Sequence, residues 1–239
     1  MAVIDNLVSW WSLDETSGDR VDSHGSNDLT DTNTVLYAAG KQSNAADFET
    51  SNSESLLKSD TADLSFTSDF SWAGWINLES LTVNQVIIGK WNTTGENRSY
   101  AFFISTGAKL RAYISDDGTN ANTSKIFFTQ TGFSTATWYH LAVAYDASAG
   151  TMDFWINGSA QTQVTGHKTS VYNSTANFGL GSSFVDFAYF DGLMDEFAVW
   201  NRLIDGTDVA TLYNSGNGVT YADISAGGVP TFIPKISII

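Results

Sequence analysis

The sequence predicts an all-β fold, built as a sandwich of two antiparallel sheets. Short apolar runs recur along the chain and are separated by clusters of Gly, Asn, Asp and Ser, a spacing typical of strands joined by turns. The clearest run places Leu141, Val143 and Tyr145 on one face, with small or polar residues between them. This period of two marks a half-buried strand. Asn157-Gly158 then offers the two positive-φ residues that a type I′ hairpin turn requires.

The predicted strands follow one another at short intervals. They cover residues 7–13, 55–58, 70–78, 85–91, 100–105, 109–115 and 125–129, then the hairpin within 138–164, and finally 178–181 and 193–200. Trp72 and Trp75 fall on opposite faces of the third strand. We therefore expect this strand either to be covered on both sides or to offer one face to a ligand.

One helix is predicted near the end of the chain. Thr207 is placed to cap its N-terminus and Gly216 to close it. After it the pattern changes, because residues 222–239 hold both prolines of the chain, are punctuated by glycine and end in an apolar run. We expect one domain over residues 1–221 and an extended C-terminal arm over 222–239.

Three stretches of the chain carry a shared pattern. They are LVSWWSLDETSGDRVDSHGSNDL (7–29), WYHLAVAYDASAGTMDFWINGSAQTQV (138–164) and FDGLMDEFAVWNR (190–202), the last followed by LYNSG. Together and in this order they resemble the laminin-G-like (concanavalin A-like) jelly-roll family. The resemblance implies a single jelly roll, in which the first and last strands pair. It leaves the function open, since this fold hosts binding modules, enzymes and structural proteins.

The composition of the chain limits the classes of partner that it is expected to bind. The chain of 239 residues has a net charge of −15 with only 11 Lys and Arg, which argues against nucleic acid and anionic membranes and suits cations and neutral sugars. No apolar run is long enough for a transmembrane helix. Cysteine is absent, which fits any compartment for a chain of this size. The N-terminus lacks the basic and apolar segments of a signal peptide.

Catalytic signatures are missing from the sequence. There is no G-x-S-x-G, no H-E-x-x-H and no cysteine nucleophile. Glycosidases of the resembling fold typically carry Glu-x-Asp-x-x-Glu on one strand, whereas this chain has only Asp191-x-x-x-Asp195-Glu196. A retaining mechanism needs two carboxyl groups about 5 Å apart, and no predicted strand supplies them. We therefore expect a protein that is not an enzyme.

A calcium site is predicted near the N-terminus. The turn from Asp22 to Asn27 is rich in oxygen ligands, which Ca²⁺ prefers. The resemblance implies that this turn and Asp195 lie near one ion, so Asp22, Asn27 and Asp195 are the expected ligands of a structural Ca²⁺. The alternative is an Asx-turn that is held by side-chain hydrogen bonds alone.

Three aromatic residues are candidates for ligand binding. Phe187 and Tyr189 lie in the segment FVDFAYF, which is either a buried strand or an exposed platform for a sugar ring. Trp91 leads the polar loop 92–98 and is a weaker candidate of the same kind.

Two functions stay open for a non-enzymatic binding or structural module. One is a virion surface protein, such as a phage decoration or fibre component, that docks on other virion proteins or on itself through the C-terminal arm. The apolar alternation at Ile236 and Ile238 favours such strand addition, although the arm could also fold back over its own sandwich. Met1, the lack of a signal peptide and the lack of cysteine favour the virion. The other function is a free or secreted, extracellular lectin-like carbohydrate-binding module. Both proteins could contact glycans.

Overall fold

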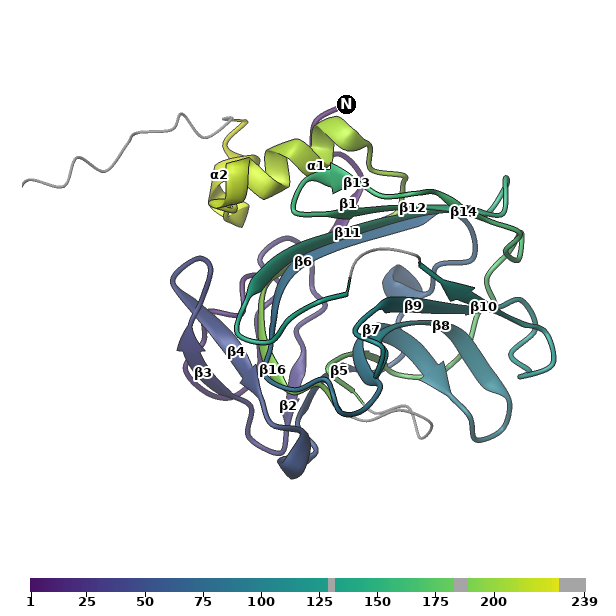
Figure 1. Cartoon of the computed structure of the whole chain (residues 1–239), viewed down its shortest axis with the longest axis horizontal. Coiled ribbons are helices and arrows are strands. Elements are labelled where there is room, and N and C mark those ends of the chain that lie inside the picture. The colour runs from purple at the N-terminus through teal and green to yellow at the C-terminus, as the bar shows by residue number, and fades with distance from the viewer. Residues whose placement is uncertain (129–131, 183–188, 228–239) are drawn as a thin grey trace, which may run out of the picture.

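In the computed structural model, which describes residues 1–128, 132–182 and 189–227, two antiparallel sheets pack face to face (Figure 1). The larger sheet has the order β13 (Ser159–Ala160), β12 (Thr151–Ile156), β11 (Trp138–Asp146), β6 (Phe70–Leu78), β16 (Gly192–Trp200), β4 (Asn44–Phe48) and β3 (Leu36–Ala39), with β1 (Leu7–Trp11) on β16 and β14 (Val164–Thr165) on β12. The smaller sheet has the order β10 (Thr123–Phe127), β9 (Leu110–Ser115), β8 (Asn97–Ile104), β7 (Gln85–Asn92), β15 (Phe178–Leu180), β5 (Ser55–Lys58) and β2 (Thr30–Thr32). The predicted sandwich is confirmed.

The pairing of β1 with β16 joins the two ends of the fold. Trp10 lies opposite Ala198 and Trp11 opposite Phe197, so the first and last strands are neighbours, as the resemblance implies. The predicted hairpin turn is also confirmed, because Asn157 and Gly158 both have positive φ. Strands β2, β3 and β4 are not among the strands that the sequence predicts. They are short and polar or rich in alanine, so they lack the alternation that marks a strand in sequence.

The main core lies between the sheets and is rich in aromatic rings. Trp72 stacks on Phe197 with ring centroids 6.1 Å apart, and Phe70 lies 4.9 Å from Tyr100. Trp75 points to the opposite side of β6, where its ring stacks on Tyr213 at 5.8 Å. The two tryptophans therefore show that β6 is covered on both sides, which was one of its two expected roles.

The predicted helix is α1 (Gly206–Tyr213), but its caps differ from those expected. Asp205, not Thr207, is the N-cap: its carboxylate accepts the backbone N–H of Thr207 and Asp208, and Asp208 reaches back in a capping box. The helix ends at Asn214 in the left-handed region, before Gly216. Short 3₁₀ turns occur at Thr50–Asn52, Ala62–Leu64 and Asn214–Gly216.

A second helix lies at the start of the predicted C-terminal arm. Residues Tyr221–Ser225 form α2, which Thr220 and Asp223 cap reciprocally, and Ile224 is buried. The described part of the arm is therefore helical and packed where an extended segment was expected. Residues 228–239 lie outside the described residues, so the docking role of the arm stays a prediction. No helix in the described part of the chain is long and apolar enough to cross a membrane.

Both helices cover the outward face of the larger sheet (Figure 1). They enclose a second apolar cluster, separate from the main core, that includes Leu7, Trp10, Ala73, Ala142, Ala144, Trp155, Ala198, Trp200, Ile204, Val209, Leu212, Val219 and Ile224. We call this the helix-covered face. The smaller sheet has no helix over its outward face among the described residues.

Candidate functional site

The outward face of the smaller sheet carries a pocket, and glycine makes room for it. Phe178 and Leu180 of β15 point into the main core, so Gly179 between them faces outward. Gly179 pairs with Gly89 of β7, which places two residues without side chains next to each other. A Cβ atom at Gly179 would lie only 2.9 Å from a methyl carbon of Leu57, so a larger residue does not fit without a shift.

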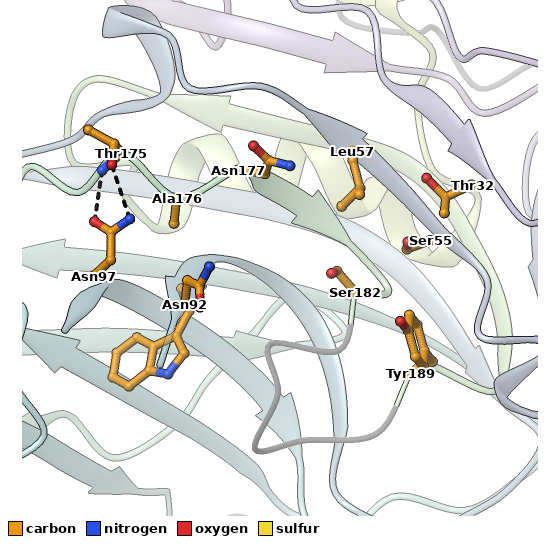
Figure 2. Close-up of a pocket in the computed structure, with 11 residues that line it drawn as sticks. Thr32, Ser55, Leu57, Asn92, Asn97, Thr175, Ala176, Asn177, Ser182 and Tyr189 are labelled. Atoms are coloured by element: carbon orange, nitrogen blue, oxygen red, sulfur yellow. Dashed lines mark hydrogen bonds between the residues drawn. The ribbon is translucent and has the colours of Figure 1, made fainter. Parts of the chain in front are cut away.

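The pocket has a volume of about 310 Å³, which is at the lower end for small-ligand sites. Strands β2, β5, β7 and β8 and the segments before and after β15 bring its lining together (Figure 2). The lining residues are Thr32, Ser55, Leu57, Trp91, Asn92, Asn97, Thr175, Ala176, Asn177, Ser182 and Tyr189. None of these side chains is acidic or basic, so the described part of the lining offers hydroxyl, amide and apolar groups.

One end of the pocket is held in place by a reciprocal pair of hydrogen bonds, drawn in Figure 2. The side-chain Nδ2 of Asn97 donates to Oγ1 of Thr175 at 3.1 Å, and the backbone N–H of Thr175 donates to Oδ1 of Asn97 at 2.9 Å. Asn92 is oriented too, because its Oδ1 accepts the backbone N–H of Thr94 at 2.8 Å. These amides are therefore positioned by the protein itself.

The structure brings two of the three predicted aromatic residues to this pocket, although they are 98 positions apart in the sequence (189 − 91). Tyr189 is partly exposed. Trp91 is only 3% exposed, because its indole packs in a small cluster with Val86, Ala101 and Phe103. Trp91 thus forms part of the wall and Tyr189 is the accessible ring. Phe187 lies outside the described residues.

The polar lining residues were not found from the sequence. Asn92 and Asn97 lie in the polar loop that Trp91 leads, which was a weak signal. Thr175 and Asn177 lie in a Ser/Thr/Asn-rich stretch like many others in this chain. Only the pairing of β15 with β7 and β5 brings that stretch to the loop.

The predicted calcium ligands have different surroundings. Both oxygens of Asp22 accept backbone N–H groups: Oδ1 from Trp10 and His24, and Oδ2 from Asn27, each at 3.0 Å. The amide of Asn27 donates to Ser9 at 2.9 Å. This is the hydrogen-bonding pattern of the alternative, the Asx-turn.

Asp195 is bound to another loop. Its Oδ2 accepts the backbone N–H of Lys41 at 2.6 Å and of Gln42 at 2.8 Å, and among the described residues no hydrogen bond joins it to the Asp22–Asn27 turn. Its Oδ1 is buried without a hydrogen-bond partner. Burial raises the pKa of Asp195 to about 7, against the opposing effect of the Gln42 and Lys41 N–H groups. A calcium ion shared by Asp22, Asn27 and Asp195 stays a prediction.

A different acidic cluster comes from residues that are far apart in sequence. The carboxylates of Asp47, Glu49 and Glu79 offer ligand atoms that all lie within 4.8 Å of one another. Burial, together with the neighbouring Asp191 carboxylate, raises the pKa of Asp47. Exposed acidic groups often gather without an ion, so this cluster has no assigned role.

Glu196, next to Asp195, is buried beneath the helix-covered face. It sits at a bulge of β16 with φ of 49°, and its Oε2 accepts the indole N–H of Trp10 at 2.5 Å. Burial, followed by the charge of Asp195, raises the pKa of Glu196 to about 9. His140 lies against the same face, and burial lowers its pKa to about 3. None of these ionisable groups lines the pocket.

A two-sheet jelly roll with an open pocket on one outward face defines a lectin-like β-sandwich. A family model described as the concanavalin A-like lectin/glucanases superfamily matches residues 48–210. The chain belongs to this superfamily, which confirms the family that the sequence motifs indicate. The search of curated proteins found no match to this chain.

Solved structures of low sequence identity share the fold. Domain 4 of AbnA, a GH43 extracellular arabinanase from Geobacillus stearothermophilus in complex with arabinotriose, is similar with a TM-score of 0.65 and 20% identity, over 90% of this chain and 98% of that one. The binding domain of Paraclostridial Mosquitocidal Protein 1 has a TM-score of 0.68 and 15% identity, over 90% of this chain and 53% of that one. The binding domain of botulinum neurotoxin DC in complex with SialylT has a TM-score of 0.68 and 13% identity, over 90% of this chain and 52% of that one. The chain spans about half the length of these two toxin domains, and all three likenesses concern the fold alone.

Proposed function

We propose that this domain is a glycan-binding module and that an oligosaccharide occupies the pocket on the smaller sheet. The observation that carries the proposal is the lining itself, where amides and hydroxyls surround a partly exposed tyrosine. A sugar ring presents an apolar C–H face and a rim of hydroxyl groups. An aromatic ring can pack against the apolar C–H face. Groups that both donate and accept hydrogen bonds can pair with the hydroxyl groups.

The comparisons support the class of ligand. Among the structural neighbours, the arabinanase domain was solved in complex with arabinotriose and the neurotoxin binding domain in complex with SialylT. Binding without cleavage is favoured by the lining, because glycoside hydrolysis uses a pair of carboxyl groups that flank the scissile bond. Within the part of the chain that the structure describes, the lining includes neither Asp nor Glu.

Oligosaccharide binding is tested on a glycan array, followed by calorimetry with the best ligand. We expect Tyr189→Ala to weaken binding by about two- to ten-fold, which corresponds to the loss of one aromatic contact. Tyr37→Ala is the matched control, since Tyr37 is 49% exposed on the edge strand β3 of the other sheet. Equal affinity of wild type, Tyr189→Ala and Tyr37→Ala would contradict binding in this pocket.

We further propose, from the sequence, a place on a virion surface, as a phage decoration or fibre component that docks through the C-terminal arm. The alternative is a free or secreted, extracellular lectin-like module. The test is incorporation into particles of a chain that ends at Gly227. This truncation leaves Ile224 and the capping box of Thr220 with Asp223 intact, so α2 is kept. Attachment equal to that of the full chain would contradict docking through the arm and favour the lectin-like module.

A further inference from the structure

The cations closest in sequence to the pocket lining are already bound to the protein. Lys90 is buried, and its Nζ donates to the Asp60 carboxylate and to the carbonyl of Ala176, each at 2.6 Å. The guanidinium group of Arg98 is 3.2 Å from the carbonyl of Gly118, to which it donates. These two side chains therefore have their charges directed to internal acceptors and away from a ligand.

Lys58 neighbours the lining residue Leu57 in the sequence. Its Nζ donates to the carbonyl of Ser26 at 3.0 Å in an exposed contact. None of the three cations lines the pocket. Proteins bind carboxylate and phosphate groups through arginine, lysine or converging backbone N–H groups, so an anionic ligand lacks its usual partners among these side chains.

Glu96, next to the lining residue Asn97 in the sequence, is an exposed carboxylate. The whole chain carries a net charge of −15. A field of this sign repels an approaching anion and lowers its local concentration, whereas an uncharged sugar is unaffected.

We infer that the pocket selects uncharged oligosaccharides and rejects acidic ones, such as those that carry uronic, sialic or sulfated units; this inference rests on the proposed glycan binding. The neutral lining provides the attraction, because Asn, Ser and Thr both donate and accept, as sugar hydroxyls do. The lack of a cation among the described lining residues and the net charge of −15 provide the discrimination, since specificity is a difference between two affinities.

The test compares ligands that differ mainly in charge, because a uronic acid carries a carboxylate in place of the C6 hydroxymethyl group of the hexose. Neutral hexose oligosaccharides and their uronic acid counterparts are titrated into the full chain at low and at high salt, beside sialylated and sulfated glycans on the same array. We expect the acidic member of each pair to bind at least about ten-fold more weakly at low salt, with a smaller gap at high salt because salt screens the repulsion.

A charge variant makes the test independent of the sugar that binds best. Asn177→Arg places a cation in the lining and is expected to raise the affinity for the acidic member at least about three-fold, whereas Asn177→Gln is not. Equal or tighter binding of acidic glycans by the wild type would overturn the inference and leave the proposed function standing. A folded chain that binds neither member of any pair would overturn both.

Discussion

The two outward faces of this sandwich differ in whether their polar groups are buried or open to a ligand. On the larger sheet, α1 and α2 cover the surface, and the carboxyl group of Glu196 lies buried beneath it with Oε1 unpartnered, whereas Asp195 is buried against the Lys41–Gln42 loop. On the smaller sheet the surface is open at the pocket, and the polar groups there are neutral amides and hydroxyls such as Asn97 and Thr175. The region beneath the helices thus buries the ionisable groups Glu196 and His140, whereas the pocket presents uncharged groups.

This difference teaches that a strongly shifted pKa does not by itself locate a binding site. The large shifts of Asp195, Glu196 and His140 arise first from burial, and burial also keeps ligands away. Perturbed groups mark functional sites when they lie in a cleft, whereas the cavity that Glu196 and His140 line has a volume of only about 10 Å³. The pocket is located by its geometry and by the chemistry of its lining.

The largest expected effect is on the stability of the helix-covered face. Trp10→Ala removes a side chain that is 1% exposed and leaves Glu196 Oε2 without its donor. We expect the free energy of unfolding to fall by about 3–5 kcal/mol, measured by denaturant titration. Tyr189→Ala is expected to change it by less than about 1 kcal/mol. Similar losses in both variants would remove the contrast between the two faces.

The second prediction concerns pH. Glu196 has a pKa near 9 when folded, against an ordinary value of 4.5, so the folded chain keeps a proton that the unfolded chain releases between these values. Stability contributed by this proton is therefore lost as pH rises from about 4.5 to 9, with a slope of up to about 1.4 kcal/mol per pH unit for one group. Asp195, with a pKa near 7, adds to the same trend in the lower part of this range.

Glu196→Gln should flatten this loss, because glutamine cannot ionise and can still accept the Trp10 N–H. Thermal unfolding at several pH values measures it, and Glu96→Gln, a change in an exposed turn, is the control. An unchanged slope in Glu196→Gln would show that this carboxyl group is not held protonated in the folded state.

The third prediction separates the Asx-turn from the calcium site. Asp22→Ala deprives the backbone N–H groups of Trp10, His24 and Asn27 of their acceptor, which should cost about 1–3 kcal/mol. If hydrogen bonds alone hold the turn, the loss is the same in Ca²⁺ and in EDTA. A melting temperature that EDTA lowers in the wild type, and that Asp195→Asn makes insensitive to EDTA, would instead support the shared calcium ion.

The smallest effect is expected at the pocket. Asn97→Ala breaks the reciprocal pair with Thr175 and should weaken oligosaccharide binding by a few-fold, since one neutral hydrogen bond contributes about 1 kcal/mol. Asn84→Ala is the matched control, because Asn84 accepts the backbone N–H of Thr106 at 3.1 Å but does not line the pocket. Equal affinities in the two variants would show that the Asn97 end of the pocket is not used.

Local patterns in the sequence determined the strands and the family. Residues 55–58 and 70–78 were predicted with the bounds that the structure shows for β5 and β6, because alternation is a property of neighbouring residues. The Asn157-Gly158 turn was predictable for the same reason. The N-cap of the helix was less predictable from the sequence. Asp205 and Thr207 are both residue types that suit an N-cap, and only the backbone geometry shows that Asp205 is the cap.

Tertiary structure alone decided the sites. The pocket joins Thr32, Asn97 and Tyr189, which no local pattern relates, because sheet pairing sets their neighbourhood. Likewise Asp22 and Asp195 are both acidic residues in matching motifs, yet one is satisfied by its own turn and the other is buried against the Lys41–Gln42 loop. The physical reason is that burial and side-chain partners depend on distant segments, whereas strand periodicity depends on the residues next in line.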